Sequence, residues 1–490
     1  MAKAEKSKKE KLSEKLLFKQ KNCWEDIDKK TEKEIEELAS SYKKFLDNGK
    51  TERECTEAIC GLLDKNGFIN IDAAQDKKLK PGMRIYRNIR GKSVLAAVIG
   101  KKPAAEGCNI LGAHLDSPRL DLKPNPLYED SDLALFDTHY YGGIKKYQWT
   151  TIPLAMHGVF VNESGKKMTV KIGEEPGDPV FTVTDLLPHL AKDQMAKKAS
   201  EAVEGEDLDI LAGSRPYNDK DEKEKVKLAL VDLLNKKYGI TERDFTSAEI
   251  EFVPAFKASD VGLDRSLIGA YGHDDRCCAY PALQALITIA NEGGAKAETE
   301  ARASSAEKSA PVKTLVCYFS DKEETGSAGN TGARSLNFEN FLTLLCGGST
   351  ADLKTCYSNC AMLSADVNAA YDPTYSGVFD KKNAAYISRG IVLEKYTGSG
   401  GKYGASDANA EFVAKVQAIL NRNKIQWQSG ELGKVDKGGG GTIALYAANL
   451  GMDVLDCGVP VLSMHSPFEV ISKIDLYTTY KGYIAFLREA

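Results

Sequence analysis

The sequence predicts an α/β protein in which one discontinuous domain, with a central mixed β-sheet flanked by helices, is interrupted by a β-rich insertion. After about residue 262, strand-like and helix-like segments alternate, which is typical of an α/β sheet. Apolar strand-like segments also precede residue 122, whereas apolar and polar residues alternate in the region between. We therefore expect one domain formed by residues 1–122 and 262–490, and an inserted domain at 123–261.

The first segment combines helices with short strands. Residues 28–65 are predicted to be helical, and Gly49, which ends TEKEIEELASSYKKFLDNG, is typical of a helix C-terminus. Strands are expected at MRIYRNIRG (83–91), KSVLAAVIGKK (92–102) and CNILGAHLDSP (108–118), where a proline ends the last run.

The insertion is expected to contain a β-hairpin. AMHGVFV (155–161) and KMTVKIG (167–173) alternate apolar and polar residues on either side of a turn. A helix is predicted to begin near Thr184, and a second helix is predicted in VKLALVDLLNKKYGI (226–240). SAEIEFVPAF (247–256) is predicted to be a strand.

The last segment shows the alternation of strands and helices most clearly. Its predicted strands are KTLVCYFSD (313–321), AMLSADVNAA (361–370) and AAYISRGIVLEKY (384–396). Its predicted helices are RCCAYPALQALITIANEGG (276–294), DANAEFVAKVQAILNRN (407–423) and TIALYAANLGM (442–452). Ser406 or Asp407 is expected to cap the second of these helices. Residues 293–313 have low complexity and are predicted to form a solvated loop.

The composition excludes several classes of protein. The net charge of −4 over 490 residues gives no case for nucleic-acid binding, and the lysine-rich N-terminus is interspersed with glutamates, as in a solvated or packed helix. No apolar run is long enough for a secretory signal or a membrane span. The 11 cysteines contain no C-x-x-C pair, which favours reduced thiols in a cytoplasmic protein.

Metal-binding residue types follow five of the strand-like runs. They are His114 and Asp116, Asp274 and Asp275, Glu323 and Glu324, Asp366, and His465. Sites in open α/β sheets gather at the carboxyl ends of strands, so we expect these side chains to lie together. Two histidines with several carboxylates suit zinc, and the number of carboxylates favours two ions that share one of them.

Each of these residues also has a structural interpretation. His114 and Asp116 share a strand face and can form a buried histidine–carboxylate pair. Asp274 precedes a predicted helix, whose N-terminus favours acids, and Asp366 can be a turn residue. The adjacent Glu323 and Glu324 alone are a chance-level feature of an acid-rich chain. Only the convergence of all five places favours a metal site.

Together these motifs resemble those of a known family, the aspartyl aminopeptidases and their vacuolar aminopeptidase I relatives, which are dinuclear zinc metallopeptidases. The stretches that carry the resemblance are GAHLDSPRLDLKP, AYGHDDRCCAY, DKEETGS, SADVNAAYDP, GGGGTIA and MHSPFE. Their order and spacing match from about residue 80 to the C-terminus, and SPFE is similar to the bacterial and vacuolar members. A strict preference for N-terminal Asp or Glu is therefore not implied.

The resemblance implies roles for individual residues. One zinc ion would be bound by His114 and Asp366, the other by Glu324 and His465, and Asp274 would bridge them. Glu323 would be the general base and Asp116 would orient His114. Cobalt or manganese would also fit such ligands.

The resemblance further implies an assembly. The inserted domain of the family mediates dimerisation, and the histidine of its PHLA motif, here His189, would reach the active site of the neighbouring subunit. Dimers would assemble into tetrahedral dodecamers. Lys402, or Lys395, would be a candidate to bind an acidic substrate side chain, although a solvated lysine is the alternative.

The sequence therefore predicts a cytoplasmic zinc aminopeptidase, a hydrolase that removes an acidic or neutral N-terminal residue from peptides. One alternative is a related two-metal N-acyl deacylase or carboxypeptidase, which would share the ligands. Another is a non-catalytic assembly protein that kept the fold. The presence of all five ligands together with Glu323 argues against the latter.

Overall fold

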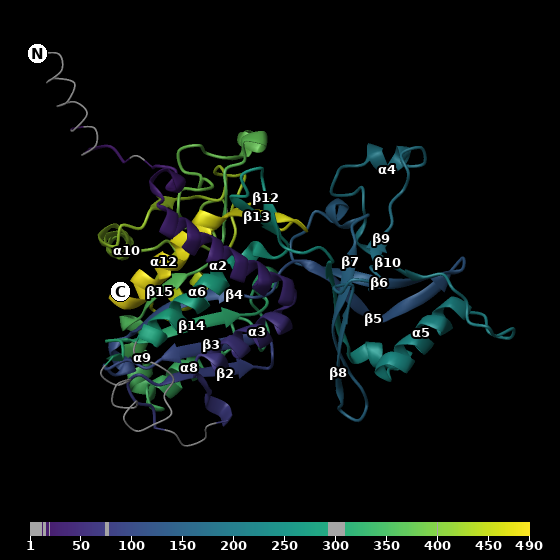
Figure 1. Ribbon diagram of the computed structural model, residues 1–490, viewed down its shortest axis with the longest axis horizontal. Coiled ribbons are helices and arrows are strands. Elements are labelled where there is room, and N and C mark those ends of the chain that lie inside the picture. Colours follow the sequence, from purple (N-terminus) through teal and green to yellow (C-terminus); the bar gives the residue numbers. More distant parts are fainter. Residues whose placement is uncertain (1–11, 13–15, 19, 74–77, 293–308, 399) are drawn as a thin grey trace, which may run out of the picture.

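The computed structural model describes residues 12, 16–18, 20–73, 78–292, 309–398 and 400–490. Figure 1 shows a larger body, which holds the C-terminus, and a smaller lobe beside it. In the described part of the chain, no helix combines the length and apolar character needed to pass through a membrane.

A nine-stranded mixed sheet forms the centre of the larger body. Its strands, in spatial order, are β1 (Ile69–Asn70), β2 (Arg84–Ile89), β3 (Ser93–Val98), β14 (Thr314–Ser320), β4 (Cys108–His114), β15 (Ala361–Ser364), β19 (Asp453–Gly458), β17 (Ile391–Glu394) and β18 (Trp427–Ser429). β14, β4, β15 and β19 are parallel to one another, so their carboxyl ends lie along the same edge. β14 and β4 are buried along their whole length, which explains their continuous apolar runs.

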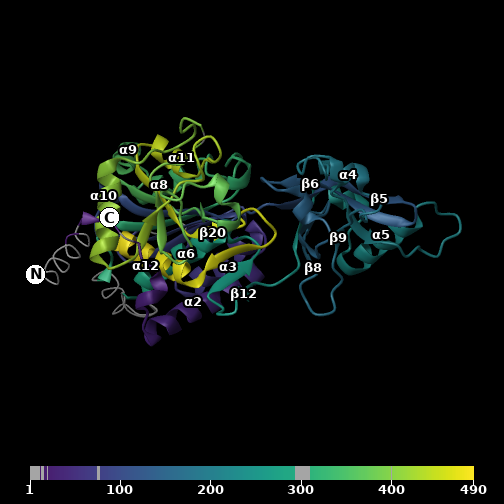
Figure 2. The same cartoon turned by 90° about the horizontal axis from the view of Figure 1, so that it is seen from above.

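Helices cover both faces of this sheet (Figure 2). One layer contains α2 (Lys29–Asn48), α3 (Glu52–Lys65), α6 (His273–Glu292), α10 (Ala410–Arg422) and α12 (Lys473–Glu489). The other contains α8 (Asn337–Leu345), α9 (Thr350–Asn359) and α11 (Ala444–Asn449). In β4, Leu111 and Ala113 pack into the first layer while Cys108 and Ile110 pack into the second, because successive side chains of a strand point to opposite faces.

A five-stranded sheet lies against this body. Its strands, in spatial order, are β12 (Ser259–Val261), β13 (Leu267–Ala270), β21 (Glu469–Ser472), β20 (Pro460–Leu462) and β16 (Asn368–Ala369). Since β13, β20 and β21 are paired with one another in this sheet, the segment after β13 is brought close to the turn between β20 and β21.

The smaller lobe is a seven-stranded sheet in which every neighbouring pair is antiparallel. Its strands, in spatial order, are β8 (Lys167–Ile172), β7 (Leu154–Val161), β11 (Glu249–Pro254), β5 (Arg119–Asp130), β6 (Leu133–Tyr141), β10 (Ile210–Gly213) and β9 (Thr182–Val183). α4 (Lys192–Ala196) and α5 (Lys225–Tyr238) complete the lobe. A separate apolar core around Trp149, Phe160 and Phe252 stabilises it.

Buried ion pairs join the lobe to the body. Lys50 Nζ lies 2.6 Å from Glu174 Oε1, and His157 contacts both Glu54, at 2.8 Å, and Glu174, at 3.1 Å. Lys50 and Glu54 belong to the start of the α3 region, whereas His157 and Glu174 belong to the lobe. We call these four residues the junction cluster.

The structure confirms the predicted α/β class with a mixed sheet between helices. The expected hairpin is also present, since β7 and β8 pair antiparallel with Met156 opposite Ile172. In the insertion, the helix expected from Thr184 is wrong. β9 ends at Val183, and the chain runs through turns until α4 begins at Lys192. Pro188 lacks the N–H that a helix interior requires.

Two smaller expectations also need correction. The cap of α10 is Asn409 rather than Ser406 or Asp407, because the Asp407 carboxylate is held by lysines outside the helix. The strand expected over 384–396 is confined to β17, its last part. The expected N-terminal helix and most of the 293–313 loop lie outside the described residues.

The strands of the lobe run from Arg119 to Pro254, and β12 already pairs with the body. We therefore propose the expected division into 1–122, 123–261 and 262–490 with each boundary moved a few residues earlier, to the start of β5 at Arg119 and of β12 at Ser259.

Candidate active site

Three of the predicted site segments follow neighbouring parallel strands. His114 is the last residue of β4, Glu323 and Glu324 form a tight turn after β14, and Asp366 follows β15 by two residues. Because the carboxyl ends of these strands lie side by side, their side chains meet at one edge of the sheet.

The five-stranded sheet supplies the remaining two segments. Asp274 lies at the start of α6, after β13, and His465 lies in the turn between β20 and β21. His465 has a φ of 64°, a backbone conformation that residues other than glycine adopt rarely and that is common at functional sites.

Asp274 stands between two histidines. Its Oδ1 lies 3.1 Å from Nε2 of His114, and its Oδ2 lies 3.2 Å from Nε2 of His465. Asp366 Oδ1 is 3.9 Å from His114 Nε2, and Glu324 Oε2 is 3.5 Å from His465 Nε2. The five side chains therefore form two groups that share one carboxylate.

Hydrogen bonds show which nitrogen of each ring faces the carboxylates. Nδ1 of His114 lies 3.0 Å from the carbonyl oxygen of Asp116, and Nδ1 of His465 lies 2.8 Å from the carbonyl oxygen of Gly143. A carbonyl oxygen only accepts, so each Nδ1 carries the proton and donates it. Each ring therefore turns Nε2 toward carboxylate oxygens, which is the orientation in which a deprotonated Nε2 can coordinate a metal ion.

Asp116 connects several parts of the site from a fully buried position. Its Oδ1 accepts the main-chain N–H of Glu323 at 3.1 Å, and its Oδ2 accepts that of Glu324 at 3.2 Å. The hydroxyl of Tyr141 donates to Oδ2 at 2.8 Å. Asp116 therefore fixes the turn that carries both glutamates as well as the ring of His114.

Two contributions were missed in the sequence. Glu469 accepts the main-chain N–H groups of Asp274, at 3.0 Å, and of His465, at 2.7 Å, and so holds two site segments together. The acid of MHSPFE was a usable signal for it. Tyr141 and Gly143 come from the lobe, and no local pattern indicates that this region reaches the site.

The site lines a cavity of about 470 Å³, whose wall includes Asp274, Glu323, Glu324, Asp366 and His465. The opposite wall is a glycine-rich stretch, Gly439 to Gly441. Glu323 is partly exposed to this cavity, with its Oε2 4.0 Å from His114 Nε2.

The carboxylates of the site have too little positive charge beside them to balance their negative charges. Burial, together with the negative charges of Asp116 and Asp274, raises the pKa of Glu323 to about 7. Burial and Asp274 likewise raise the pKa of Glu324 well above its usual range. Although burial opposes it, the hydrogen bond to Asp274 raises the pKa of His465 to about 10. These shifts all have the direction expected of a cluster of carboxylates that lacks a cation.

The residues fit zinc. Oδ1 of Asp274 and Oε1 of Glu324 are buried, yet neither accepts a hydrogen bond within the described part of the chain. Zinc–ligand distances of about 2.0–2.2 Å place two ligands of one tetrahedral ion about 3.4 Å apart, close to the observed separations of 3.1–3.5 Å around Asp274 and His465. Two histidines with carboxylates are a donor set that zinc accepts.

His189 and Lys402 lie away from this cluster. His189 is exposed in a turn of the lobe. Nζ of Lys402 lies 2.9 Å from Asp407 and 3.7 Å from the ring centre of Tyr396, and it lines an adjoining cavity rather than the one that holds Glu323. Their expected roles remain predictions.

The fold and the histidine–carboxylate cluster define a metal-dependent hydrolase of the α/β class. Residues 45–487 match the family described as aminopeptidase I zinc metalloprotease (M18). The chain therefore belongs to the M18 family, and it is a zinc aminopeptidase.

Individual relatives agree with this assignment. A probable M18 family aminopeptidase 1 of Clostridium acetobutylicum is 50% identical over 478 residues, which cover 96% of this chain and 99% of the relative. The crystal structure of an M18 aminopeptidase from Thermotoga maritima is 44% identical, covers 96% of this chain and 100% of its own, and superposes with a TM-score of 0.89. The mApe1 dodecamer of S. cerevisiae, 22% identical with a TM-score of 0.72 over 92% of this chain and 97% of its own, shares the fold.

Proposed function

We propose that the protein removes N-terminal residues from peptides at a centre of two zinc ions per subunit. His114 and Asp366 would hold one ion, Glu324 and His465 the other, and Asp274 would bridge them. The observation that carries the proposal is the position of Asp274, whose two oxygens each face the Nε2 of a different histidine. Cobalt or manganese can replace zinc in such a site.

Glu323 moves the proton. Zinc, when bound, lowers the pKa of the attacking water and polarises the scissile carbonyl. Glu323 lines the cavity within metal-ligand spacing of His114 and Asp366. With Asp274 completing that ligand group, the Glu323 carboxylate would be free to accept a proton from that water. It then donates the proton to the leaving amine, and both roles suit a pKa near neutrality.

Asp116 positions the reacting groups. It orients His114 and fixes the turn of Glu323 and Glu324 through their main-chain N–H groups. Partners of this kind keep a ligating histidine in one tautomer and one orientation.

The negative cavity favours substrates with a free amino group. The ammonium group at the start of a peptide is attracted by the carboxylates that line the wall, such as Glu324 and Asp366. A cavity of about 470 Å³ has room for one or two residues rather than for a folded chain. These features support exopeptidase rather than endopeptidase activity.

The lobe carries a surface suited to a second copy of the chain. Four large apolar side chains around His189 are half exposed or more, namely Leu186, Leu187, Leu190 and Met195. Such patches mark interfaces. We place dimer formation on this part of the lobe, where His189 would extend into the partner's site and stabilise the reacting carbonyl. Tetrahedral dodecamers would follow from further contacts, in line with the dodecamer of S. cerevisiae mApe1.

His189→Ala tests this arrangement. Turnover should fall while the assembly, measured by light scattering, persists. If the assembly is lost but the turnover per subunit is unchanged, His189 contributes to packing between subunits and not to catalysis.

The thiols support a cytoplasmic location. All 11 cysteines are free, and most of them are buried. Free thiols in this number are typical of a reducing compartment.

The decisive experiment compares free and blocked substrates. Aminoacyl arylamides and short peptides are tested beside their N-acetylated forms, after chelation and again after zinc is restored. We expect hydrolysis of the free forms only, lost on chelation and recovered with zinc. Activity confined to blocked amino groups would indicate a deacylase, release of C-terminal residues a carboxypeptidase, and inactivity throughout a non-catalytic protein.

A further inference from the structure

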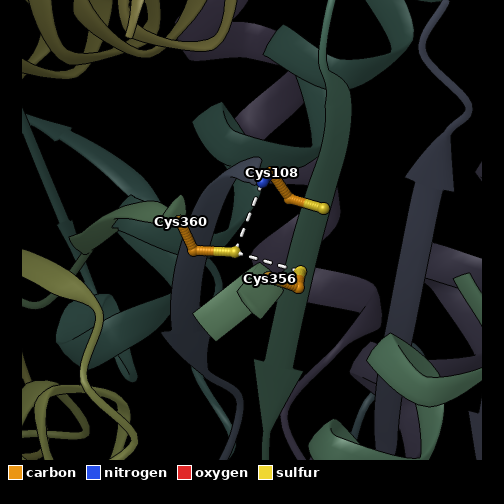
Figure 3. A group of neighbouring side chains, drawn as sticks. All are labelled: Cys108, Cys356 and Cys360. Atoms are coloured by element: carbon orange, nitrogen blue, oxygen red, sulfur yellow. Dashed lines mark hydrogen bonds between the residues drawn. The ribbon is translucent and has the colours of Figure 1, made fainter. Parts of the chain in front are cut away.

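Three buried thiols meet on the sheet face opposite α6 and α12 (Figure 3). Cys108 opens β4, Cys356 lies in α9, and Cys360 caps that helix before β15. Their sulfur atoms all lie within 4.8 Å of one another, and those of Cys356 and Cys360 are 3.6 Å apart. Each side chain is at most 2% exposed.

The spacing of the sulfur atoms suits one metal ion. A zinc–sulfur distance of about 2.3 Å places thiolates about 3.8 Å apart in a tetrahedral site and about 4.0 Å apart in a trigonal one. The main-chain N–H of Cys108 donates to the sulfur of Cys360 at 3.3 Å, as N–H groups do to sulfur ligands of metal centres.

A fourth thiol lies close to this group. Cys346, at the end of α8, is partly exposed and interacts with Cys356. Gly347 and Gly348 follow it, and both have positive φ values, so the loop into α9 runs through conformations that favour glycine.

We propose that Cys108, Cys356 and Cys360 bind a thiophilic metal ion of the class of Zn²⁺, Cd²⁺ or Cu⁺. Soft thiolates select such ions. The site is separate from the catalytic centre, because Cys108 and His114 are at opposite ends of β4, about 20 Å apart for a strand of this length. The bound ion ties α9 to β4, so binding stabilises the folded chain.

Cadmium provides a clean test because the residues assigned to the catalytic centre contain no sulfur. The full-length protein is freed of metal, reduced and titrated with Cd²⁺. We expect sulfur-to-cadmium charge-transfer absorption, lost in Cys356→Ser/Cys360→Ser and retained in the control Cys277→Ser, which alters a buried thiol elsewhere. The unfolding temperature should rise with Cd²⁺ more in the control than in the double variant.

A measurement on the wild-type chain covers the case in which the double variant fails to fold. X-ray absorption at the cadmium edge should show sulfur neighbours in addition to nitrogen and oxygen. Only nitrogen and oxygen neighbours, or charge-transfer bands of equal strength in the folded double variant, would show that these cysteines are ordinary core residues.

A second, independent observation concerns the cavity of the active site. Glu394, at the end of β17, lines the same cavity as Glu323 and is 7% exposed. The amide of Asn368 donates to its Oε2 at 2.6 Å, but its Oε1 accepts no hydrogen bond from the residues that the structure describes. A buried carboxylate oxygen without a partner calls for a donor from outside the chain.

Two lysines, Lys402 and Lys434, line the adjoining cavity with Glu394, but Lys402 is paired with Asp407 and Lys434 Nζ donates to the carbonyl oxygen of Gly377. Burial and the nearby Asp456 raise the pKa of Glu394 to about 8. Lys395 and Lys402, the lysines of the same segment, are both paired with Asp407. Positive charge on a ligand would therefore be favoured at this wall.

We infer that Glu394 selects the side chain of the first substrate residue, favouring lysine or arginine and disfavouring aspartate or glutamate; this inference rests on the proposed aminopeptidase activity. Opposite charges across a contact that excludes water determine which substrate side chain is preferred more than they determine how tightly the substrate binds.

Lysyl, norleucyl and glutamyl arylamides test the inference. We expect kcat/KM in the order lysyl, norleucyl, glutamyl for the wild type. Glu394→Gln should reduce the lysyl-to-norleucyl ratio by about tenfold, the effect of one charged hydrogen bond, and Glu106→Gln, at an exposed position that lines neither this cavity nor the adjoining one, should not. Cleavage of none of the substrates would overturn the proposed function itself. Cleavage with a wild-type preference for the glutamyl compound, or with ratios that Glu394→Gln leaves unchanged, would overturn only the role of Glu394.

Discussion

The protein contains two clusters of buried charge that differ in how their charges are balanced. In the junction cluster, acids and bases from the same chain face one another, as Glu174 faces Lys50 and His157. In the active site, Asp274, Glu323, Glu324 and Asp366 form ion pairs with histidines alone within the described part of the chain.

The pKa values of the acids reflect this difference. Although burial opposes it, His157 and Lys50 lower the pKa of Glu174 to about 2. Burial and neighbouring acids instead raise the pKa of Glu323 to about 7. A buried carboxylate is stable as an anion only beside a cation. The junction therefore stabilises the fold by itself, whereas the active site depends on ions from solution.

The largest expected effect is on catalysis. Glu323→Gln should lower kcat by about a thousandfold or more, because the amide cannot accept the proton of the attacking water. Since Glu323 is not among the proposed ligands, metal analysis should find the wild-type zinc content. A variant with unchanged turnover would remove Glu323 from the role of base.

Replacement of a glutamate by glutamine should have opposite effects on the free energy of unfolding in the junction cluster and in the active site. Glu174→Gln should cost about 3 kcal/mol of the free energy of unfolding, because it leaves Lys50 buried without its anion. Glu324→Gln in the metal-free protein should leave this free energy unchanged or raise it, because it removes a repelled charge. Denaturant unfolding of both chelated variants measures the contrast, and equal losses would contradict it.

Asp116→Asn should weaken the binding of zinc, an effect smaller than those above. It keeps the size of the side chain but weakens the support of His114 and of the glutamate turn. The affinity for zinc should fall by about 10–100-fold. Zinc competition with a chelating dye measures this, and excess zinc should recover part of the turnover. Wild-type affinity would show that Asp116 does not orient the ligands.

The smallest effect is a pH dependence of stability that belongs to the junction. Hydrogen bonds to Glu174 and Glu54 raise the pKa of His157 above 6.5, although burial opposes them. A raised pKa means that the stabilisation is fully present below pH 6.5 and is lost as the pH rises through the folded value. Glu174, with its lowered pKa, contributes above 4.5 and loses its contribution as the pH falls toward 2.

The contribution of His157 is tested by measuring the free energy of unfolding of the chelated protein between about pH 6 and pH 9. The difference in the free energy of unfolding between wild type and His157→Gln should shrink as the pH rises. A difference independent of pH would assign His157 a neutral packing role.

Much of the fold and of the candidate ligand set could be predicted because the signals are local. Apolar runs mark the buried strands, and His114, Glu324 and Asp366 each follow such a run within a few residues. In a parallel arrangement these ends must lie together. The same motifs carried the resemblance to the family that the comparisons bear out.

The remaining features depend on contacts between distant segments. Tyr141 reaches Asp116 from the lobe, and His157 meets Glu54 across 103 positions. Neither contact leaves a periodicity in the sequence. The helix expected near Thr184 failed for a related reason, because the apolar side chains there are exposed rather than packed on a core. Pattern alone cannot tell a buried apolar face from an exposed one.

If the acids of the active site are balanced by two metal ions arranged around Asp274, both ions should be visible in the zinc-loaded protein. An anomalous difference map at the zinc edge, from crystals of the zinc-loaded protein, tests it most directly. We predict two peaks in this cavity, one on either side of Asp274, next to His114 and His465 respectively. A single peak in the cavity, or none beside Asp274, would contradict the account.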